Sequence, residues 1–403
     1  MVAIESSSFA GSGSPAAAPA ASRGRGAVSN VGHRFQRDAR GVDTDTLDHD
    51  LHDGTPVPNP ATQVQSEQAK RLISRNDSPD IPFTQAVNPY RGCEHGCIYC
   101  YARPTHAYLG YSPGLDFETR LVAKTNAVAA LRAELARPGY VPSVITLGSA
   151  TDAYQPIERQ HRLARGILEL MLETRHPVSV ITKNALVERD LDLLTELARH
   201  GLVSVVVSLT TLDAGVARTL EPRASAPWRR LQTLGRLAQA GIPTGVSVAP
   251  VIPFINDDQI ERIVSAAAEQ GVSRAFYTVI RLPYEVREVF EQWLHAHFPD
   301  RAARVLHRIE DMRGGRRNDP RFGSRMRGTG IWADLIAQRF RLAVTRAGMD
   351  TTRWVEFDAE LGLDQFIAPA RARPAGAEAP LRFTPRPRAG AASAGAQLGL
   401  FDA

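Results

Sequence analysis

Short runs of β-branched and apolar residues alternate along the middle of the chain with longer stretches in which apolar residues recur at helical spacing. The short runs predict six strands, at about 85–91, 143–148, 178–182, 203–209, 245–250 and 274–280. One helix between them is expected to have Asp190 as its N-cap and to end at Gly201, and another to have Asn256 as its N-cap and to end at Gly271. This alternation is typical of βαβ units and a parallel sheet.

The number of units limits the architecture. Six strands with intervening helices leave no room for two more units before the Pro- and Arg-rich segment after residue 282. The fold class predicted is therefore α/β, with a partial (β/α)6 barrel of the TIM type rather than the closed eight-unit form. In such folds the chemistry is found where strands end and loops begin, so the strand ends are where candidate residues are sought.

Both ends of the chain lack an apolar period. Among residues 1–30, 21 are Ala, Ser, Gly or Pro, and the chain from Arg371 onward is rich in Ala, Pro, Gly and Arg. Such segments bury too little apolar surface to offset the entropy of ordering. The expected organisation has four parts, namely a disordered segment at 1–77, the barrel at 78–281, a C-terminal extension packing on the barrel at 282–368 and a disordered tail at 369–403.

Charge and composition add weaker limits. The net charge of +5 and the pI near 9.3 permit an anionic partner without requiring one. No apolar run is long enough for a membrane helix and the first residues lack the features of a secretory signal, so a cytoplasmic protein without membrane contact is expected. Only three residues are lysine, among 48 Lys and Arg, which makes a lysine at a strand end notable.

The cysteines give the sharpest indication of chemistry. The chain holds three, all on the loop after the first predicted strand in the pattern CxxxCxxC, namely Cys93, Cys97 and Cys100. An odd, clustered set is not a disulfide framework, so metal or redox chemistry is favoured. Three thiolates hold three irons of a 4Fe-4S cluster and leave the fourth iron open.

Neighbouring residues suit such a loop. Gly92 and Gly96 let it curl around a cluster without Cβ clashes, and Tyr99 supplies an aromatic wall. The alternative is a zinc site in which His95 or His106 joins the three thiolates.

The pattern CxxxCxΦC, in which Φ is aromatic, resembles the hallmark of the radical S-adenosylmethionine (SAM) superfamily, and the resemblance covers about residues 83–285. It implies one 4Fe-4S cluster whose open iron binds the amino and carboxylate groups of SAM. It also implies reductive cleavage of SAM to methionine and a 5′-deoxyadenosyl radical, with an electron donor such as flavodoxin or ferredoxin. The chemistry would belong to the cofactor, while the protein orients it and excludes water.

Polar residues follow the next three predicted strands. Ser149, Thr151 and Asp152 come after the second strand and suit a cationic amine or a ribose, although Thr151 and Asp152 also suit capping of the next helix. Lys183 ends the third strand, where a compact ammonium suits the SAM carboxylate; a solvated loop lysine is the alternative. Ser208 ends the fourth strand and is placed to reach the ribose.

A further loop carries Glu221 and Arg223 around Pro222, for which ligand contact and an internal salt bridge are both open. With the strand-end residues, this loop resembles the spore photoproduct lyase branch of the superfamily, and more narrowly a bacterial group of uncharacterised proteins allied to it. The resemblance implies SAM contacts from Thr151, Lys183 and Ser208. Ser149 stands where those lyases have a hydrogen-donating cysteine, which puts that particular repair reaction in doubt.

Two features of the C-terminal part bear on partners. Residues 301–330 hold nine arginines, which suits phosphate contacts in a nucleic acid, although a solvated arginine surface is equally consistent. The tail resembles the QLxLF peptide with which bacterial replication and repair proteins bind the sliding clamp, through Gln397, Leu398, Leu400 and Phe401. Folding of the tail back onto its own core is the alternative.

The sequence thus predicts a radical SAM enzyme, with a nucleic acid as the favoured substrate in DNA repair or modification. An enzyme acting on a peptide or small metabolite is the alternative, and a non-enzymatic iron-sulfur protein is a third class. The predicted metal ligands are Cys93, Cys97 and Cys100, and the predicted cofactor contacts are Tyr99, Ser149, Thr151, Asp152, Lys183, Ser208 and Arg223. No catalytic residue is assigned.

Overall fold

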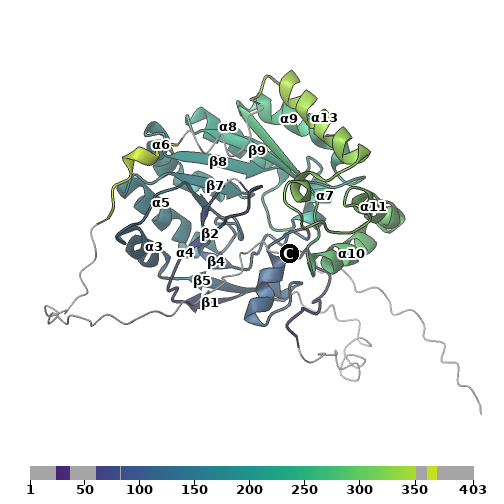
Figure 1. The fold of residues 1–403 in the computed structure, drawn as a ribbon, viewed down its shortest axis with the longest axis horizontal. Helices are drawn as coiled ribbons and strands as arrows, with labels where there is room; N and C mark the ends of the chain where they lie inside the picture. Colours follow the sequence, from purple (N-terminus) through teal and green to yellow (C-terminus); the bar gives the residue numbers. More distant parts are fainter. Residues whose placement is uncertain (1–23, 37–59, 82, 351–360, 370–403) are drawn as a thin grey trace, which may run out of the picture.

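A seven-stranded sheet forms the centre of the molecule (Figure 1). The structure is a computed structural model, and it describes residues 24–36, 60–81, 83–350 and 361–369. In their order across the sheet, the strands are β10 (Arg274–Val279), β9 (Thr244–Val251), β8 (Val203–Ser208), β7 (Val178–Thr182), β6 (Ile145–Leu147), β3 (Gln85–Val87) and β2 (Ile73–Arg75). Neighbours from β3 to β10 are parallel, whereas β2 pairs antiparallel with β3 at the edge. The six predicted strands are confirmed, and their arrangement in chain order is that of a partial β/α barrel.

The first predicted strand is divided in two. It ends at Val87, and the chain continues through Asn88 and Pro89 into β4 (Tyr90–Arg91). That short strand belongs to a second sheet with the order β1 (Gln63–Glu67), β5 (Arg120–Lys124) and β4. Proline has no N–H for a strand ladder, so the run cannot continue through Pro89 as a central strand. The chain therefore leaves the main sheet just before the cysteines.

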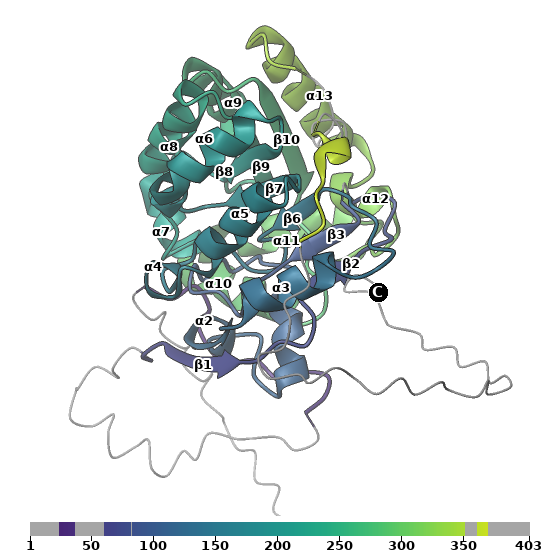
Figure 2. The same cartoon turned by 90° about the vertical axis from the view of Figure 1, so that its left-hand side faces the viewer.

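Helices cover one face of the main sheet (Figure 2). They are α3 (Ala127–Leu135), α5 (Leu163–Glu173), α6 (Leu191–Arg199), α8 (Pro227–Gln239) and α9 (Ile260–Glu269). Shorter helices lie between strands and loops, namely η1 (Arg103–Leu109), α2 (Asp116–Thr119), α4 (Glu158–His161), η2 (Ala185–Asp190), α7 (Ala214–Leu220), η3 (Asp257–Gln259) and η4 (Leu363–Gln365). The inward faces of the long helices and every residue of β8 are buried, so the core lies between the helices and the sheet.

The two helices expected from their end signals are present as α6 and α9. Gly201 and Gly271 follow them with positive φ angles of 65° and 82°, as C-terminal glycines do. The predicted N-caps differ from expectation, because neither Asp190 nor Asn256 makes a side-chain cap hydrogen bond. Asp190 instead pairs with arginines, and the Asn256 amide donates to the carbonyl of Thr210 at 2.8 Å. Long-range partners have replaced the local ones.

The C-terminal extension consists of α10 (Val286–His297), α11 (Pro299–Asp311), α12 (Ser324–Arg327) and α13 (Ile331–Arg346). Trp293 of α10 is fully buried, as expected for a core residue, and its Nε1 donates to the carbonyl of Thr219 at 3.0 Å. Arg313 is also buried and donates to the carbonyls of Val279 and Ile280, at the end of β10. The extension is thus attached to the barrel by buried contacts.

Part of the N-terminal region departs from the expectation of disorder over 1–77. Strands β1 and β2 form within it, and Ala27, Val28 and Val31 are buried. The small residues of this region allow close packing, since a Cβ on Gly26 would come within 1.8 Å of the carbonyl oxygen of Gly96. Composition averages over a segment and does not reveal such a docked stretch.

The C-terminal tail and membrane spans were also the subject of predictions. The predicted clamp-binding peptide at Gln397–Phe401 lies outside the described residues. Over the described part of the chain, no helix combines the length and apolar character that a membrane span requires.

Candidate active site

The loop after β4 carries the three cysteines, Cys93, Cys97 and Cys100. The amide of Cys93 donates to the carbonyl of Phe117 at 2.9 Å, which fixes the start of the loop. Gly92 and Gly96 have φ angles of 72° and 68°, and a Cβ on Gly96 would come within 2.8 Å of Glu118 Oε2. Both positions therefore require glycine, as the sequence indicated.

The thiols lie largely out of solvent. Cys93 and Cys97 are buried and Cys100 is partly buried. Burial raises the pKa of Cys97 to about 12 and that of Cys93 well above its usual range. The protein alone thus keeps the thiols of Cys93 and Cys97 protonated, and a bound metal has to displace their protons.

Polar atoms beside the cysteines fit a further bound group. Glu94 Oε2 and both ring nitrogens of His106 are buried without a hydrogen-bond partner among the described residues. Burial lowers the pKa of His106 to about 4, so its ring is neutral at pH 7 and offers one donor and one acceptor. Unpartnered buried groups are uncommon, so these atoms are candidates to contact a bound group. The ligands that fit an iron-sulfur cluster are the three thiols of the loop. Within the described residues, no three His, Cys, Asp or Glu side chains are grouped closely enough to hold a metal ion.

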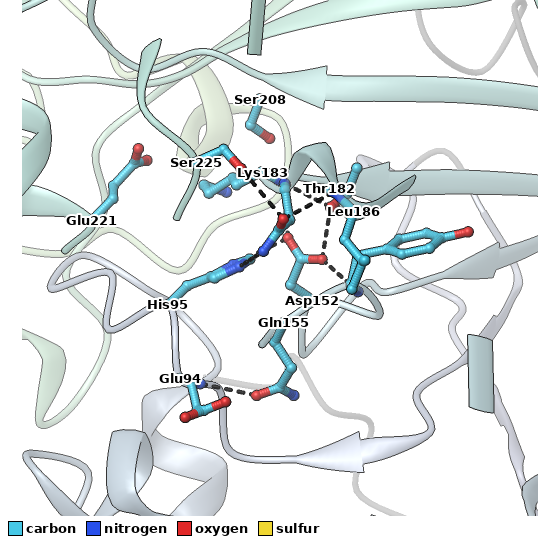
Figure 3. Close-up of polar contacts among 12 residues, drawn as sticks. Glu94, His95, Asp152, Gln155, Thr182, Lys183, Leu186, Ser208, Glu221 and Ser225 are labelled. Atoms are coloured by element: carbon cyan, nitrogen blue, oxygen red, sulfur yellow. Dashed lines mark hydrogen bonds and ion pairs between the residues drawn. The ribbon is translucent and has the colours of Figure 1, made fainter. Parts of the chain in front are cut away.

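Asp152 connects the cysteine loop to the strand ends (Figure 3). Its Oδ1 accepts from Tyr154 N and Thr182 Oγ1, both at 2.8 Å, and its Oδ2 accepts from Lys183 N at 2.7 Å. The same Oδ2 lies 3.3 Å from His95 Nδ1 in the cysteine loop. Burial acts to raise the pKa of Asp152, but His95 and these hydrogen bonds outweigh it and lower the pKa to about 2. Asp152 is thus a carboxylate that joins β6, β7 and the cysteine loop.

His95 is held from its other side as well. Its Nε2 lies 3.1 Å from the side-chain nitrogen of Asn184, which follows Lys183. Asn184 Oδ1 in turn accepts from Leu186 N at 3.0 Å and caps η2. The cysteine loop is therefore fixed to the carboxyl end of β7 through one histidine.

Ser149 and Thr151 lie in the loop after β6 and make local contacts. Ser149 Oγ accepts from Asn88 Nδ2 at 3.1 Å, and the carbonyl of Ser149 accepts from the Tyr101 hydroxyl. Thr151 Oγ1 donates to the carbonyl of Tyr90 at 3.3 Å. Together these residues contact the chain on either side of the cysteines, and their role as cofactor contacts stays a prediction.

Lys183 and Tyr99 face each other, with Lys183 Nζ 5.9 Å from the centre of the Tyr99 ring. Burial acts to lower the pKa of Lys183, but the acidic groups Cys97, Glu221 and Asp152 outweigh it and raise the pKa. The lysine is therefore a cation at neutral pH. It stands between the cysteine loop and the end of β7, at a place where a carboxylate ligand would meet it.

Sequence reasoning missed a buried polar group around Glu221. The Glu221 carboxylate contacts the Tyr99 hydroxyl and pairs with Arg230, and its Oε1 accepts from Thr210 Oγ1 at 2.6 Å. Burial acts to raise the pKa of Glu221, but Arg230 and Lys183 outweigh it and lower the pKa. An arginine nine residues after a glutamate is no signal in a chain this rich in arginine, so only the fold identifies the pair.

The last two predicted contacts are placed differently. Ser208 ends β8, buried and opposite Ser247 of β9 at the barrel mouth. Arg223 instead contacts the cysteine loop, with its Nη2 3.0 Å from Glu94 Oε1 and its amide donating to the carbonyl of His95 at 3.3 Å. Glu221 and Arg223 thus each form a salt bridge with a residue outside their loop, Arg230 and Glu94 respectively.

The arginines of residues 301–330 do not form one uniform surface. Arg313 and Arg325 are buried, and Arg325 pairs with Asp80 at 2.6 Å. Arg317 pairs with acidic residues, whereas Arg316 and Arg327 are exposed. The expectation of a phosphate-binding loop therefore fails for the buried members, whose charge is used inside the protein.

Comparison with protein families identifies a domain of the Radical SAM superfamily at residues 87–267. An uncharacterized protein of Mycobacterium tuberculosis is 38% identical over 226 residues, which are 56% of this chain and 66% of that protein. An uncharacterized protein of Methanocaldococcus jannaschii is 26% identical over 242 residues, or 60% and 86% of the two chains. The chain thus spans just under two thirds of the mycobacterial relative.

Solved structures with a similar fold include spore photoproduct lyase. Its complex with dinucleoside spore photoproduct matches with a TM-score of 0.52 and 18% identity, covering 71% of this chain and 80% of that one. A single-site mutant of the lyase matches with a TM-score of 0.50 and 16% identity, covering 76% and 92%. At these identities the similarity concerns the fold.

Proposed function

Because this chain belongs to the radical SAM superfamily, whose members use SAM and a 4Fe-4S cluster, we propose that Cys93, Cys97 and Cys100 hold such a cluster. When bound, the cluster supplies the electron that cleaves SAM to methionine and a 5′-deoxyadenosyl radical. That radical takes a hydrogen atom from the substrate. The observation that carries this proposal is the contact of His95 with Asp152 and Asn184, because it holds the cysteine loop over the strand ends.

The remaining predicted contacts receive SAM. Lys183 is a cation in a partly exposed position and pairs with the SAM carboxylate, because a charged acceptor there offsets its own desolvation. Thr151 and Ser208, at the ends of β6 and β8, offer hydroxyl groups on either side of it. Asp152 contributes by orienting Lys183 through the lysine amide.

The favoured substrate is a nucleic acid, in DNA repair or modification. Support comes from the positive charge of the chain, from exposed arginines such as Arg316 and Arg327, and from a fold shared with a lyase solved with a dinucleoside photoproduct. Ser149 has no thiol to donate hydrogen, so the reaction differs from one that uses a cysteine there. A peptide or small metabolite as substrate is the alternative, as is a non-enzymatic iron-sulfur protein. We place the enzyme in the cytoplasm with flavodoxin or ferredoxin as electron donor, while clamp binding stays a prediction on the tail.

The first experiment tests the cofactors. Anaerobic reconstitution should give about four irons and four sulfides per chain, as a single 4Fe-4S cluster requires, and dithionite should then convert SAM to 5′-deoxyadenosine. Exchange of Cys97 for Ala should abolish both. Purified protein with one zinc, no sulfide and no SAM cleavage would overturn the proposal in favour of the zinc site.

The second experiment tests the substrate class. Retention on a DNA column should fall with rising salt, and the log–log slope should decrease when Arg316 and Arg327 are exchanged for Gln. The matched control exchanges two exposed arginines on α10 and α6, Arg287 and Arg199. Flow-through that does not depend on salt supports the peptide or metabolite alternative.

A further inference from the structure

Three aromatic side chains are exposed around one arginine, at residues that are far apart in the sequence. Phe35 is 49% exposed, Tyr108 is 65% exposed and Tyr284 is 44% exposed. The Arg34 guanidinium lies 3.9 Å from the ring centre of Tyr284, 5.0 Å from that of Phe35 and 5.8 Å from that of Tyr108. The rings of Phe35 and Tyr108 are 5.2 Å apart. These four residues form what we call the aromatic patch.

The N-terminal contribution to the patch is held in place from the interior. The amides of Gly26 and Ala27 donate to the buried Glu118 carboxylate at 2.9 and 2.8 Å. Val31 exchanges two hydrogen bonds with Ser112 Oγ, at 2.9 and 2.8 Å. These buried hydrogen bonds fix the chain up to Val31, and the exposed Arg34 and Phe35 follow three and four residues later. A segment that only covered the core would not need to hold an exposed Arg-Phe pair in place.

The other two rings come from elements next to the cysteine loop. Tyr108 lies on η1, the helix that begins three residues after Cys100. Tyr284 follows Arg281, whose guanidinium lies 5.2 Å from the ring centre of Tyr101. The aromatic patch therefore borders the loop that carries the proposed cluster.

The backbone at Tyr284 is also unusual. Its φ angle is 49°, in the left-handed region that residues with a side chain rarely adopt. Such a conformation is strained, and strained residues are concentrated at functional sites. The half-exposed ring of Tyr284 lies over the Arg34 guanidinium rather than in the core.

We propose that the aromatic patch is a stacking site for unpaired bases of a single-stranded or locally opened nucleic acid next to the cysteine loop. This inference rests on the proposed nucleic-acid function. Aromatic rings and the planar guanidinium stack on the faces of bases, and every base offers such a face. In an intact duplex the faces of each base are covered by the stacked neighbouring base pairs, so the patch selects unpaired bases. Because Arg34 already lies 3.3 Å from Glu285, its contact is mainly stacking and depends little on salt.

The test measures binding of a fluorescently labelled single-stranded oligothymidylate and of a matched duplex to the reconstituted enzyme by anisotropy at fixed salt. The variants are Phe35→Ala, Tyr108→Ala and Tyr284→Gly, where glycine retains the positive φ. One lost stacking contact, worth about 1 to 3 kcal/mol, should weaken single-strand binding by about fivefold to a hundredfold. The control Trp228→Ala removes another exposed ring, 60% exposed on α8, and should leave binding unchanged.

Cleavage of SAM without substrate and the iron content should stay normal in all variants, which separates lost recognition from misfolding. Single-strand binding by the wild type that survives all three exchanges overturns the patch and leaves the nucleic-acid function intact. No binding of either oligonucleotide by the wild type overturns both. Retained oligonucleotide binding together with lost reduction by flavodoxin would assign the patch to a protein partner and also overturn the proposal.

Discussion

Exchange of Glu118 for Gln should release the N-terminal residues 24–36 from the cysteine loop. The Glu118 carboxylate is fully buried and accepts from Ala27 N at 2.8 Å, from Gly26 N at 2.9 Å and from the guanidinium of Arg103. Glutamine has the same shape, but it presents an NH₂ group where one oxygen stood. One donor then faces another donor, and the buried charge of Arg103 loses its counterion.

The structure sets the size of this effect. Removal of one partner of a buried ion pair costs about 3 to 5 kcal/mol. Arg103 also donates to four backbone carbonyls, those of Gly96, Cys97, Pro113 and Gly114, and these continue to solvate its charge. We therefore expect the lower end, about 3 kcal/mol, which is more than a hundredfold in the local opening equilibrium.

Hydrogen exchange followed by mass spectrometry reports this opening. In Glu118→Gln, the amides of Gly26 and Ala27 should exchange about a hundredfold faster, and the midpoint of urea unfolding should fall. The control Glu173→Gln breaks a pair with Arg132 in which both side chains are exposed, at 51% and 32%, so it should change stability by less than 1 kcal/mol. Equal exchange rates in both variants and the wild type would refute the reasoning.

The other predictions concern single charged groups. Lys183→Ala should leave iron content intact and weaken SAM binding by about ten- to a hundredfold, the value of one charge-assisted contact, as measured by isothermal titration; unchanged affinity would make Lys183 a loop lysine. Burial acts to raise the pKa of Asp80, but the ion pair with Arg325 outweighs burial and lowers the pKa. The pair therefore stabilises the fold above the ordinary Asp pKa of about 4, and this stabilisation is lost as the pH falls below that value. The melting temperature of Asp80→Asn should therefore lie below that of the wild type at pH 6, with a gap that closes below about pH 4, and a gap independent of pH would contradict this. Arg313→Gln should lower the melting temperature because it removes four hydrogen bonds to carbonyls, three of them buried, whereas Arg316→Gln should leave it unchanged. Calorimetry on the two variants distinguishes these roles.

The sequence was sufficient for the sheet because its signal is local. A parallel strand that is buried on both faces reads as a continuous apolar run, as β8 does at Val203–Ser208. The helices between the strands follow from apolar spacing and terminal glycines. The division between β3 and β4 was missed although Asn88 and Pro89 mark it, because residues 85–91 are predicted as one strand.

Docking of the N-terminal residues was not predictable from composition. A stretch such as Gly26-Ala27-Val28 has few groups to bury and reads as disordered. Its order depends on a carboxylate 91 and 92 residues further on, at Glu118, and on space next to Gly96 that only a residue without a Cβ can occupy. Neither condition leaves a trace in the segment itself.

In the candidate site, too, local features could be predicted from the sequence and long-range contacts could not. The cysteine loop is a local motif, and its thiols and glycines could be assigned from spacing alone. The role of Asp152 could not, because a carboxylate after a strand serves equally as a ligand or as a cap. In the fold, both of its oxygens are occupied by Tyr154, Thr182, Lys183 and His95, so a cationic ligand would have to displace one of these partners. The structure thus favours Asp152 as a positioning residue. It holds the amide of Lys183, the residue that we propose for the contact with the SAM carboxylate.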